Sequence, residues 1–256
     1  MKRTAFLAYG IACYAVFFAT FLYAIGFIGN LWVPKTIDAA PTVPFVQALL
    51  VNTLLLGVFA IQHSVMARPA FKKYWTRIVP QPLERATYVL ASSLALVLLF
   101  WAWEPMGGLV WDVSGTIGGT VLTALYFAGW ALLLYVTFLI NHFDLFGLSQ
   151  VWNEFRQREA QPLKFVTPSL YRWVRHPLYV AWLMIFWMAQ TMTVTHLVFA
   201  LACTGYILIA IQLEERNLAE AHPEYAQYKR KVPMLIPSFR RRLDRRSAAE
   251  LVADAS

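Results

Sequence analysis

Long apolar runs, separated by short polar links, dominate the pattern along the chain. Four of these runs are long enough to cross a bilayer as single α-helices, which takes about 20 residues. They are Ala5–Ile28, Phe45–Met66, Ala86–Trp103 and Thr116–Ile140. Three prolines in the link after the first run exclude a continuous helix there, because proline removes a backbone donor and clashes with the preceding turn. We therefore predict four transmembrane helices in residues 1–140.

A fifth apolar run, Leu178–Leu213, is too long for one crossing and short for two. We predict a helical hairpin that turns near Thr191–Thr195, so that both of its ends return to the same side of the membrane. The hairpin would bring together two polar clusters that are far apart in the sequence. They are Arg175, His176 and Pro177 before the run, and Glu214 and Glu215 after it.

The composition supports a membrane protein. Of the 256 residues, 59% are hydrophobic and only 14% are charged, whereas a soluble domain has about 25% charged residues. The predicted fold is an all-α polytopic integral membrane protein with about six transmembrane helices, the last two forming the hairpin. We expect a single domain over residues 1–256. It consists of four spans (1–140), a polar segment with the hairpin (141–237) and a basic tail (238–256).

The charge distribution predicts the orientation. The chain carries 22 Lys and Arg, and 21 of them lie in residues 1–4, 67–86, 141–177 and 214–256, with only Lys35 elsewhere. Because Lys and Arg concentrate in cytoplasmic loops, we predict a multi-pass protein of a bacterial-type inner membrane with both termini in the cytoplasm. The net charge is +8, and the basic residues flank apolar segments. This position favours anionic lipid over nucleic acid as their binding partner. No obligate protein partner is indicated.

The cluster before the hairpin has the features of an anion site. Pro177 is suited to the first turn of a helix, which would leave the N–H groups of Leu178 and Tyr179 free to bind a carboxylate. The structural alternative for Arg175 is that it anchors the helix at the lipid headgroups.

The acidic pair after the hairpin needs a cationic partner. Carboxylates at a helix C-terminus face the negative end of the helix dipole, so Glu214 and Glu215 require either Arg175 or a bound cation. Tyr225 and Tyr228 are spaced to place two aromatic rings on one helical face nearby. The alternative for each tyrosine is packing at the membrane interface.

Three further residues are candidates for acid–base chemistry. His142 lies two residues before Asp144, whose carboxylate could orient the imidazole and fix its tautomer. His63 lies inside the second apolar run, where a hydrogen-bonded structural role is the alternative. We predict no metal site, because no two of these residues have the spacing typical of metal ligands. His196 and His222 are expected to be surface residues.

Several motifs carry a resemblance. R-H-P-L-Y, then E-E-x-x-L after the hairpin, then Y-x-x-Y-x-x-x-V-P-x-x-x-P resemble the membrane methyltransferases of the isoprenylcysteine carboxyl methyltransferase type. This match covers Val166–Pro237. The upstream segments Q-H-S-V-M-A-R-P, P-L-E-R-A-T-Y and N-H-F-D-L-F-G-L-S-Q-V-W are similar to the bacterial methanethiol S-methyltransferases of that superfamily, which extends the resemblance over most of the chain.

The resemblance implies S-adenosylmethionine as cofactor, bound on the cytoplasmic side. Matched position by position, it assigns cofactor contacts to one group of residues before and inside the hairpin. These are Val166, Tyr171, His176, Pro177, Leu178, Tyr179 and Glu214. From their charges and aromatic faces, we also expect Arg175, Glu215, Tyr225 and Tyr228 to bind the cofactor. The prenylcysteine enzymes have an arginine about one turn before the acidic cluster, which binds the substrate carboxylate, but this chain has Ala210 there. The difference favours a small thiol over a carboxylate.

The resulting hypothesis is a thiol S-methyltransferase that methylates a small thiol such as methanethiol to dimethyl sulfide. His142 oriented by Asp144, or His63 in its place, would take the thiol proton, since the thiolate is the nucleophile. Other acceptors of the superfamily remain alternatives, namely a prenylcysteine carboxylate or a lipid amine. A non-catalytic membrane protein or transporter of the same architecture is the alternative from another class.

Overall fold

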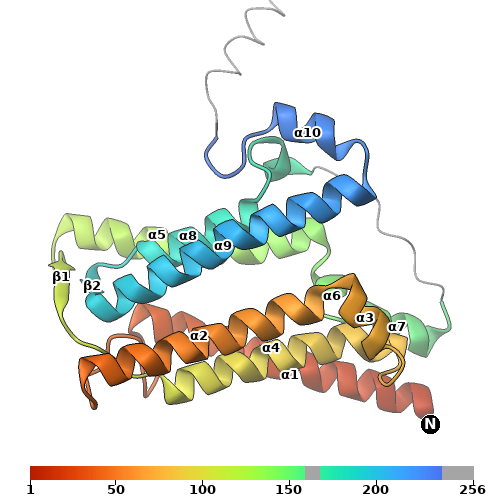
Figure 1. The fold of residues 1–256 in the computed structure, drawn as a ribbon, viewed down its shortest axis with the longest axis horizontal. Coiled ribbons are helices and arrows are strands. Elements are labelled where there is room, and N and C mark those ends of the chain that lie inside the picture. The colour runs from red at the N-terminus through yellow and green to blue at the C-terminus, as the bar shows by residue number, and fades with distance from the viewer. Residues whose placement is uncertain (159–167, 238–256) are drawn as a thin grey trace, which may run out of the picture.

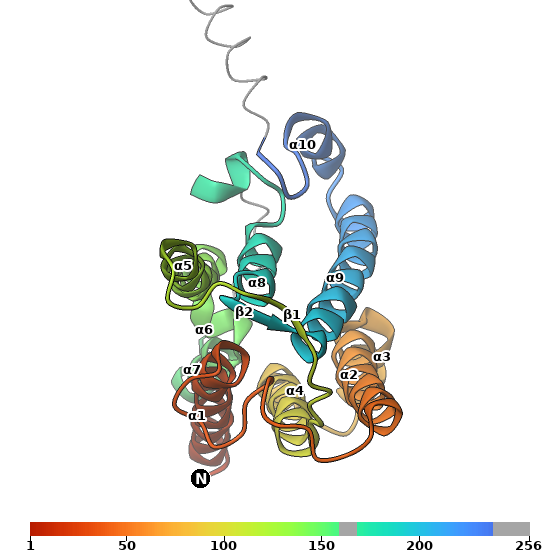
Figure 2. The same cartoon turned by 90° about the vertical axis from the view of Figure 1, so that its left-hand side faces the viewer.

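The computed structural model describes residues 1–158 and 168–237. Six helices form two layers (Figures 1 and 2). One layer contains α1 (Lys2–Gly29), α4 (Gln81–Ala102) and α2 (Phe45–Ala67). The other contains α5 (Ile117–Ile140), α8 (Pro177–Trp187) and α9 (Val194–Ala221). All six have apolar sequences and pack side by side. Their helical hydrogen bonds satisfy the backbone groups internally, as a bilayer requires.

The shorter elements divide between the two ends of the layers. The end that holds the N-terminus (right in Figure 1) also holds four short helices, and we call it the site end. These helices are α3 (Pro69–Trp75), α6 (His142–Leu145), α7 (Leu148–Arg156) and α10 (Tyr225–Lys231). The opposite end holds strands β1 (Leu109–Asp112) and β2 (Thr191–Thr193), and we call it the far end.

The predicted spans are confirmed, with one exception. Among the described residues, five helices are long and apolar enough to cross a membrane, and they are α1, α2, α4, α5 and α9. The first helix of the predicted hairpin, α8, has only 11 residues. At 1.5 Å per residue it is about 16 Å long, roughly half of the hydrocarbon thickness. The predicted count of six transmembrane helices is therefore not confirmed.

The chain continues from α8 towards the far end as an extended segment that is paired with protein. Strand β2 runs antiparallel to β1, the Val113 N–H donates to the Gln190 carbonyl at 2.9 Å, and the Trp111 indole donates to the Ala189 carbonyl at 3.1 Å. Non-helical backbone is tolerated at membrane depth only where such partners exist. The turn of the hairpin thus lies where the sequence predicted it, but it is built as a small sheet.

A buried histidine–aspartate pair supports this turn and corrects one prediction. His196 was expected at the surface, yet its side chain is only 1% exposed. Its Nδ1 lies 3.2 Å from Asp38 Oδ2 and its Nε2 lies 3.0 Å from the Phe186 carbonyl. The Thr193 hydroxyl donates to the same aspartate. The pair therefore ties the link after α1 to the turn between α8 and α9.

Candidate functional site

A buried carboxylate joins the segments on both sides of the hairpin. The side chain of Glu215, in α9, is 3% exposed. Its Oε1 lies 2.7 Å from Arg175 Nε and 3.0 Å from His176 Nε2, and its Oε2 lies 2.7 Å from Lys229 Nζ. We call these four residues the clamp. The predicted proximity of the two polar clusters is confirmed, and Lys229 is a member that the sequence reasoning missed.

Arg175 extends the clamp to the segment after α10. Its guanidinium donates to the Val232 carbonyl at 2.6 Å, and its backbone N–H donates to the Pro233 carbonyl at 2.8 Å. The His176 N–H donates to the Met234 carbonyl at 3.2 Å. The guanidinium has five donors in a planar fork, so it can bind Glu215 and the backbone at once. Arg175 therefore holds the backbone that follows α10. These contacts explain its position without the alternative role as a lipid-headgroup anchor.

Glu214 differs from its neighbour in exposure and partners. Its side chain is 47% exposed. The Tyr179 hydroxyl donates to Glu214 Oε2 at 3.0 Å, while His176 Nδ1 lies 4.0 Å from the same oxygen. Tyr171 lies within electrostatic range of Glu214, and burial, reinforced by this charge, raises the pKa of the Tyr171 phenol. Glu214 is thus an accessible carboxylate beside the phenol groups of Tyr171 and Tyr179.

The two tyrosines of α10 have different surroundings. The Tyr228 hydroxyl donates to the Tyr171 carbonyl at 2.6 Å, which links α10 to the 3₁₀ helix η1 (Ser169–Arg172). Burial raises the pKa of Tyr228 to about 12. Tyr225 is 1% exposed and lies within electrostatic range of Glu215. Their ring centroids are 5.8 Å apart, so the predicted aromatic pair is present, and it lies next to the clamp.

The start of α8 fits the prediction in part. Pro177 occupies the first turn, as expected. The Tyr179 N–H donates to the His176 carbonyl at 3.1 Å, so the prediction that it is free is wrong. The N–H of Leu178 remains the candidate donor for an anion. Val166, another predicted cofactor contact, lies outside the described residues.

The predicted pairing of Asp144 with His142 is wrong. His142 Nδ1 lies 2.8 Å from the Thr137 hydroxyl and its Nε2 lies 2.8 Å from the Tyr14 hydroxyl. The carboxylate of Asp144 instead accepts from the Gln150 amide at 3.1 Å. A histidine and an aspartate two residues apart in a helical turn point in different directions, and here each found partners on its own side.

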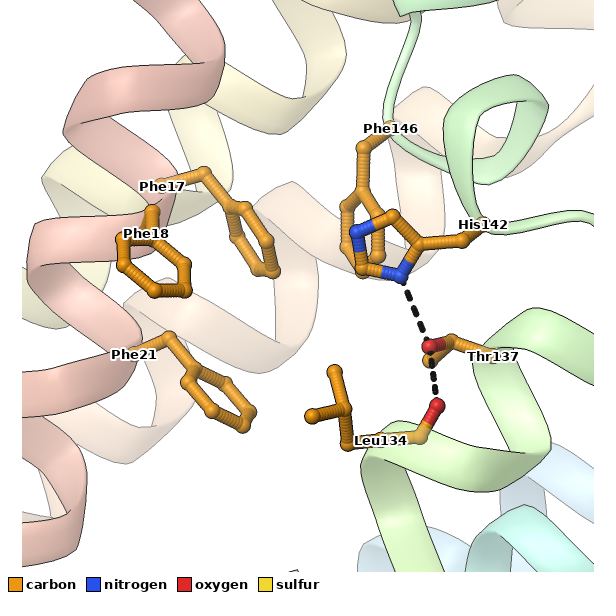
Figure 3. Close-up of a pocket in the computed structure, with 7 residues that line it drawn as sticks. All are labelled: Phe17, Phe18, Phe21, Leu134, Thr137, His142 and Phe146. Atoms are coloured by element: carbon orange, nitrogen blue, oxygen red, sulfur yellow. Dashed lines mark hydrogen bonds between the residues drawn. The ribbon is translucent and has the colours of Figure 1, made fainter.

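Figure 3 shows the surroundings of His142, which line a small aromatic cavity between α1 and the end of α5. The cavity has a volume of about 20 Å³, which is close to the space that one water molecule needs. Burial lowers the pKa of His142 below its ordinary value. Besides His142, the lining residues are Phe17, Phe18, Phe21, Leu134, Thr137 and Phe146.

His63 has polar neighbours on the helix opposite. Its Nδ1 lies 3.2 Å from the Ser92 hydroxyl, and the Tyr88 hydroxyl lies 3.0 Å from its Nε2. The Arg85 guanidinium lies over the Tyr88 ring, 5.0 Å from the centroid. Within residues 1–158 and 168–237, no group of three His, Cys, Asp or Glu side chains could hold a metal ion.

Comparison with known proteins places the chain in a family. Residues 128–227 match the model of the isoprenylcysteine carboxyl methyltransferase family. The chain is 54% identical to a methanethiol S-methyltransferase of Crocosphaera subtropica, over 93% of both chains. It is 52% identical to methanethiol S-methyltransferase 1 of Bradyrhizobium diazoefficiens, over 92% of this chain and 83% of the relative.

A third relative supports the same assignment. The methanethiol S-methyltransferase of Mycobacterium tuberculosis is 50% identical, over 93% of this chain and 98% of its own length. No solved structure matches the chain. Identities of this size over almost the whole chain show that the protein belongs to the methanethiol S-methyltransferase family.

Proposed function

We propose that the protein transfers a methyl group from S-adenosylmethionine to methanethiol, with dimethyl sulfide and S-adenosylhomocysteine as products. The observation that carries this proposal is the accessible carboxylate of Glu214 beside the clamp, in a chain whose relatives are named methanethiol S-methyltransferases. When bound, S-adenosylmethionine supplies an electrophilic methyl group on a sulfonium.

The residues of the site end fit the charges of that cofactor. Glu215 already faces Arg175, His176 and Lys229 of the chain itself, so Glu214 is the carboxylate available for an ammonium or sulfonium group. The electron-rich faces of Tyr171 and Tyr179 suit a cation, and the Leu178 N–H at a helix N-terminus suits a carboxylate. We therefore propose that Glu214 binds the cofactor directly, while Arg175, His176 and Glu215 hold the site together.

The second hairpin helix supports a neutral acceptor. Ala210 stands where a carboxylate-binding arginine would be expected, and no Lys or Arg occurs between Leu197 and Leu213. A carboxylate acceptor would thus enter an apolar region without a cationic partner, which is costly. A small thiol needs no such partner.

The chain's own contribution to the reaction is mainly positioning. Holding two reactants in line can lower the barrier by about 7–11 kcal/mol. The clamp fixes the start of α8 against α9, so the side chains around Glu214 keep their places. The helices α8 and α9 are apolar, and an apolar surrounding favours a step in which opposite charges neutralise each other.

We further propose that the protein lies in the cell membrane with the site facing the cytoplasm. The N-terminus and α10 lie at the same end of the bundle (Figure 1), and basic residues concentrate in the segments of that end. The positive-inside rule assigns such an end to the cytoplasm, where S-adenosylmethionine is made available.

Calorimetric titration of S-adenosylhomocysteine into the detergent-purified protein tests the proposal, together with an assay of methyl transfer to methanethiol. The variant Glu214→Gln should bind about 10–100-fold more weakly, since a hydrogen bond to a charged group contributes about 1.5–3 kcal/mol. Glu220→Gln is the matched control, because this exposed residue of α9 pairs with Arg216 one turn away. Absence of binding by the folded wild type would refute the enzyme proposal, and transfer only to carboxylates or amines would refute the thiol acceptor.

A further inference from the structure

A hydrogen-bonded polar cluster lies inside the bundle, where α2, α4 and α9 meet. It joins His63 to Ser92 and Tyr88, and Ser64 to the Tyr206 hydroxyl at 3.0 Å. We call these five residues the inner cluster. Polar side chains within membrane-spanning helices are costly and commonly mark a functional site. None of the five belongs to the clamp, so the cluster needs an explanation of its own.

Tyr179 connects the inner cluster to the proposed cofactor site. Its hydroxyl donates to Glu214 at 3.0 Å, and it lies within electrostatic range of both Tyr88 and Tyr206. One tyrosine side chain therefore faces the exposed carboxylate and also lies near the hydroxyl groups of the inner cluster. His142, by contrast, contacts Tyr14 on α1 and Thr137 on α5 through its two ring nitrogens.

The imidazole of His63 has one nitrogen position that a ligand can take. The Tyr88 hydroxyl lies 3.1 Å from Nδ1 and 3.0 Å from Nε2, but a hydroxyl has a single proton and can donate to only one of them at a time. Ser92 is the second partner of Nδ1, at 3.2 Å. The bond to Nε2 is therefore the one that an incoming S–H group can replace without leaving the ring unpaired.

The surroundings of His63 suit a small, weakly acidic thiol. The Phe59 ring stacks on the imidazole at 5.2 Å between centroids, which provides an apolar surface for a methyl group. The Arg85 guanidinium, 5.0 Å from the centre of the Tyr88 ring, lies within electrostatic range of His63. A cation there favours a thiolate over a neutral thiol, and it also disfavours a lasting positive charge on the imidazole, so the proton has to leave His63 again.

We propose that the inner cluster is the acceptor site and that His63 Nε2 takes the proton of the thiol as its sulfur attacks the methyl group. This inference rests on the proposed function. A sulfur lone pair of the thiol forms the new bond to the methyl carbon. The bond from that carbon to the sulfonium breaks, and its electron pair stays on the departing sulfur. The S–H proton moves to His63, which later releases it to water. Ser92 acts as a positioning residue for the ring.

Two thiols of different acidity test this role in the purified full-length protein. His63→Gln should lower kcat/KM for methanethiol about 100-fold, the lower part of the range for general base catalysis. Its affinity for S-adenosylhomocysteine should stay within about twofold of the wild type, because the variant leaves the clamp intact. The more acidic trifluoroethanethiol is already ionised to a larger extent, so its loss should be less than about 10-fold. The matched control is His222→Gln, at the end of α9 and paired with Glu224.

A second variant keeps the test valid if His63→Gln fails to fold. Ser92→Ala removes only the hydroxyl beside Nδ1 and should lower kcat/KM for methanethiol about 10-fold, with a smaller loss for trifluoroethanethiol. Equal losses of kcat/KM for both thiols in these variants, or values within about threefold of the wild type, would overturn the role of His63. Methyl transfer by the wild type would still uphold the proposed function. A loss confined to His142→Gln would likewise overturn it. A wild type that binds S-adenosylhomocysteine but methylates no thiol would refute the proposed acceptor, and this inference with it.

Discussion

Helix α9 carries a buried histidine–carboxylate pair at each of its ends, and the two pairs differ in one respect. At the far end, His196 and Asp38 are 1% and 8% exposed. At the site end, His176 and Glu215 are 4% and 3% exposed. Glu215 and His196 are 19 residues apart, or about 28 Å along the helix axis. At the site end, the residue directly before Glu215 is a further carboxylate, Glu214, whose side chain is 47% exposed.

The difference separates a structural pair from a site. Asp38 lies within hydrogen-bond distance of Thr193, Asn30 and His196, so three side chains of the protein bind this carboxylate. The clamp uses Glu215 in the same way, but it holds Glu214 beside Tyr179 with one face towards solvent. A buried ion pair is by itself weak support for a function. The accessible charge next to it is what distinguishes the site end.

Breaking the clamp should have the largest effect. Glu215→Ala leaves Arg175 and Lys229 without their carboxylate, and losing one partner of a buried ion pair costs about 3–5 kcal/mol. We expect a lower free energy of unfolding in detergent and no measurable binding of S-adenosylhomocysteine. Glu220→Ala, which removes an exposed charge of the same helix, should change neither. A stable Glu215→Ala variant with normal binding would contradict the clamp.

Weakening the pair at the far end should affect stability alone. Asp38→Asn keeps a side chain of the same shape but loses the charge opposite His196, which should cost about 1–3 kcal/mol of unfolding free energy. The dissociation constant of S-adenosylhomocysteine should stay unchanged, because the site lies at the other end of α9. Asp112→Asn, at an exposed carboxylate of β1, is the control. A weaker affinity in Asp38→Asn would show that the two ends are coupled.

Loosening the support behind Glu214 should have a smaller effect on binding. Tyr228→Phe removes the hydroxyl that donates to the Tyr171 carbonyl at 2.6 Å, and one such bond contributes about 0.5–1.5 kcal/mol. We expect affinity for S-adenosylhomocysteine to fall about 3–10-fold, measured by calorimetry. Tyr74→Phe, at an exposed position of α3, serves as the comparison and should bind normally.

Acidification should give the smallest effect, and it sharpens the comparison at the far end. Burial raises the pKa of Asp38, but the hydrogen bonds and charge of His196 and the bonds from Thr193 and Asn30 outweigh it and hold the pKa below its ordinary value. A lowered pKa gives stability that is present above the unfolded value, about 3.9, and is lost as the pH falls through the folded value. Acidification from about pH 5 to 3 should therefore destabilise the wild type more than Asp38→Asn, as measured by thermal unfolding at each pH. Parallel curves for the two proteins would contradict the assignment.

Several features of the site were predictable because they depend on neighbours in the sequence or on a simple closure. The turn near Thr191–Thr195 and the approach of Arg175 to Glu215 follow from the length of one apolar run. Lys229 was missed, since nothing in a short basic helix indicates which of its three cations turns inward. The burial of His196 was missed too, because its partner Asp38 lies 158 positions earlier.

The sequence by itself determined the membrane class, five of the six predicted spans and the polar clusters at the ends of the last hairpin, because hydropathy and proline positions act locally. The tertiary structure decided the rest. It directed Asp144 away from His142, shortened α8 to 11 residues by pairing the following segment with β1, and divided two adjacent glutamates into a buried clamp and an exposed carboxylate. Consecutive residues of a helix point about 100° apart, so only the packing of the neighbouring helices could decide which of them faces the protein and which faces the ligand.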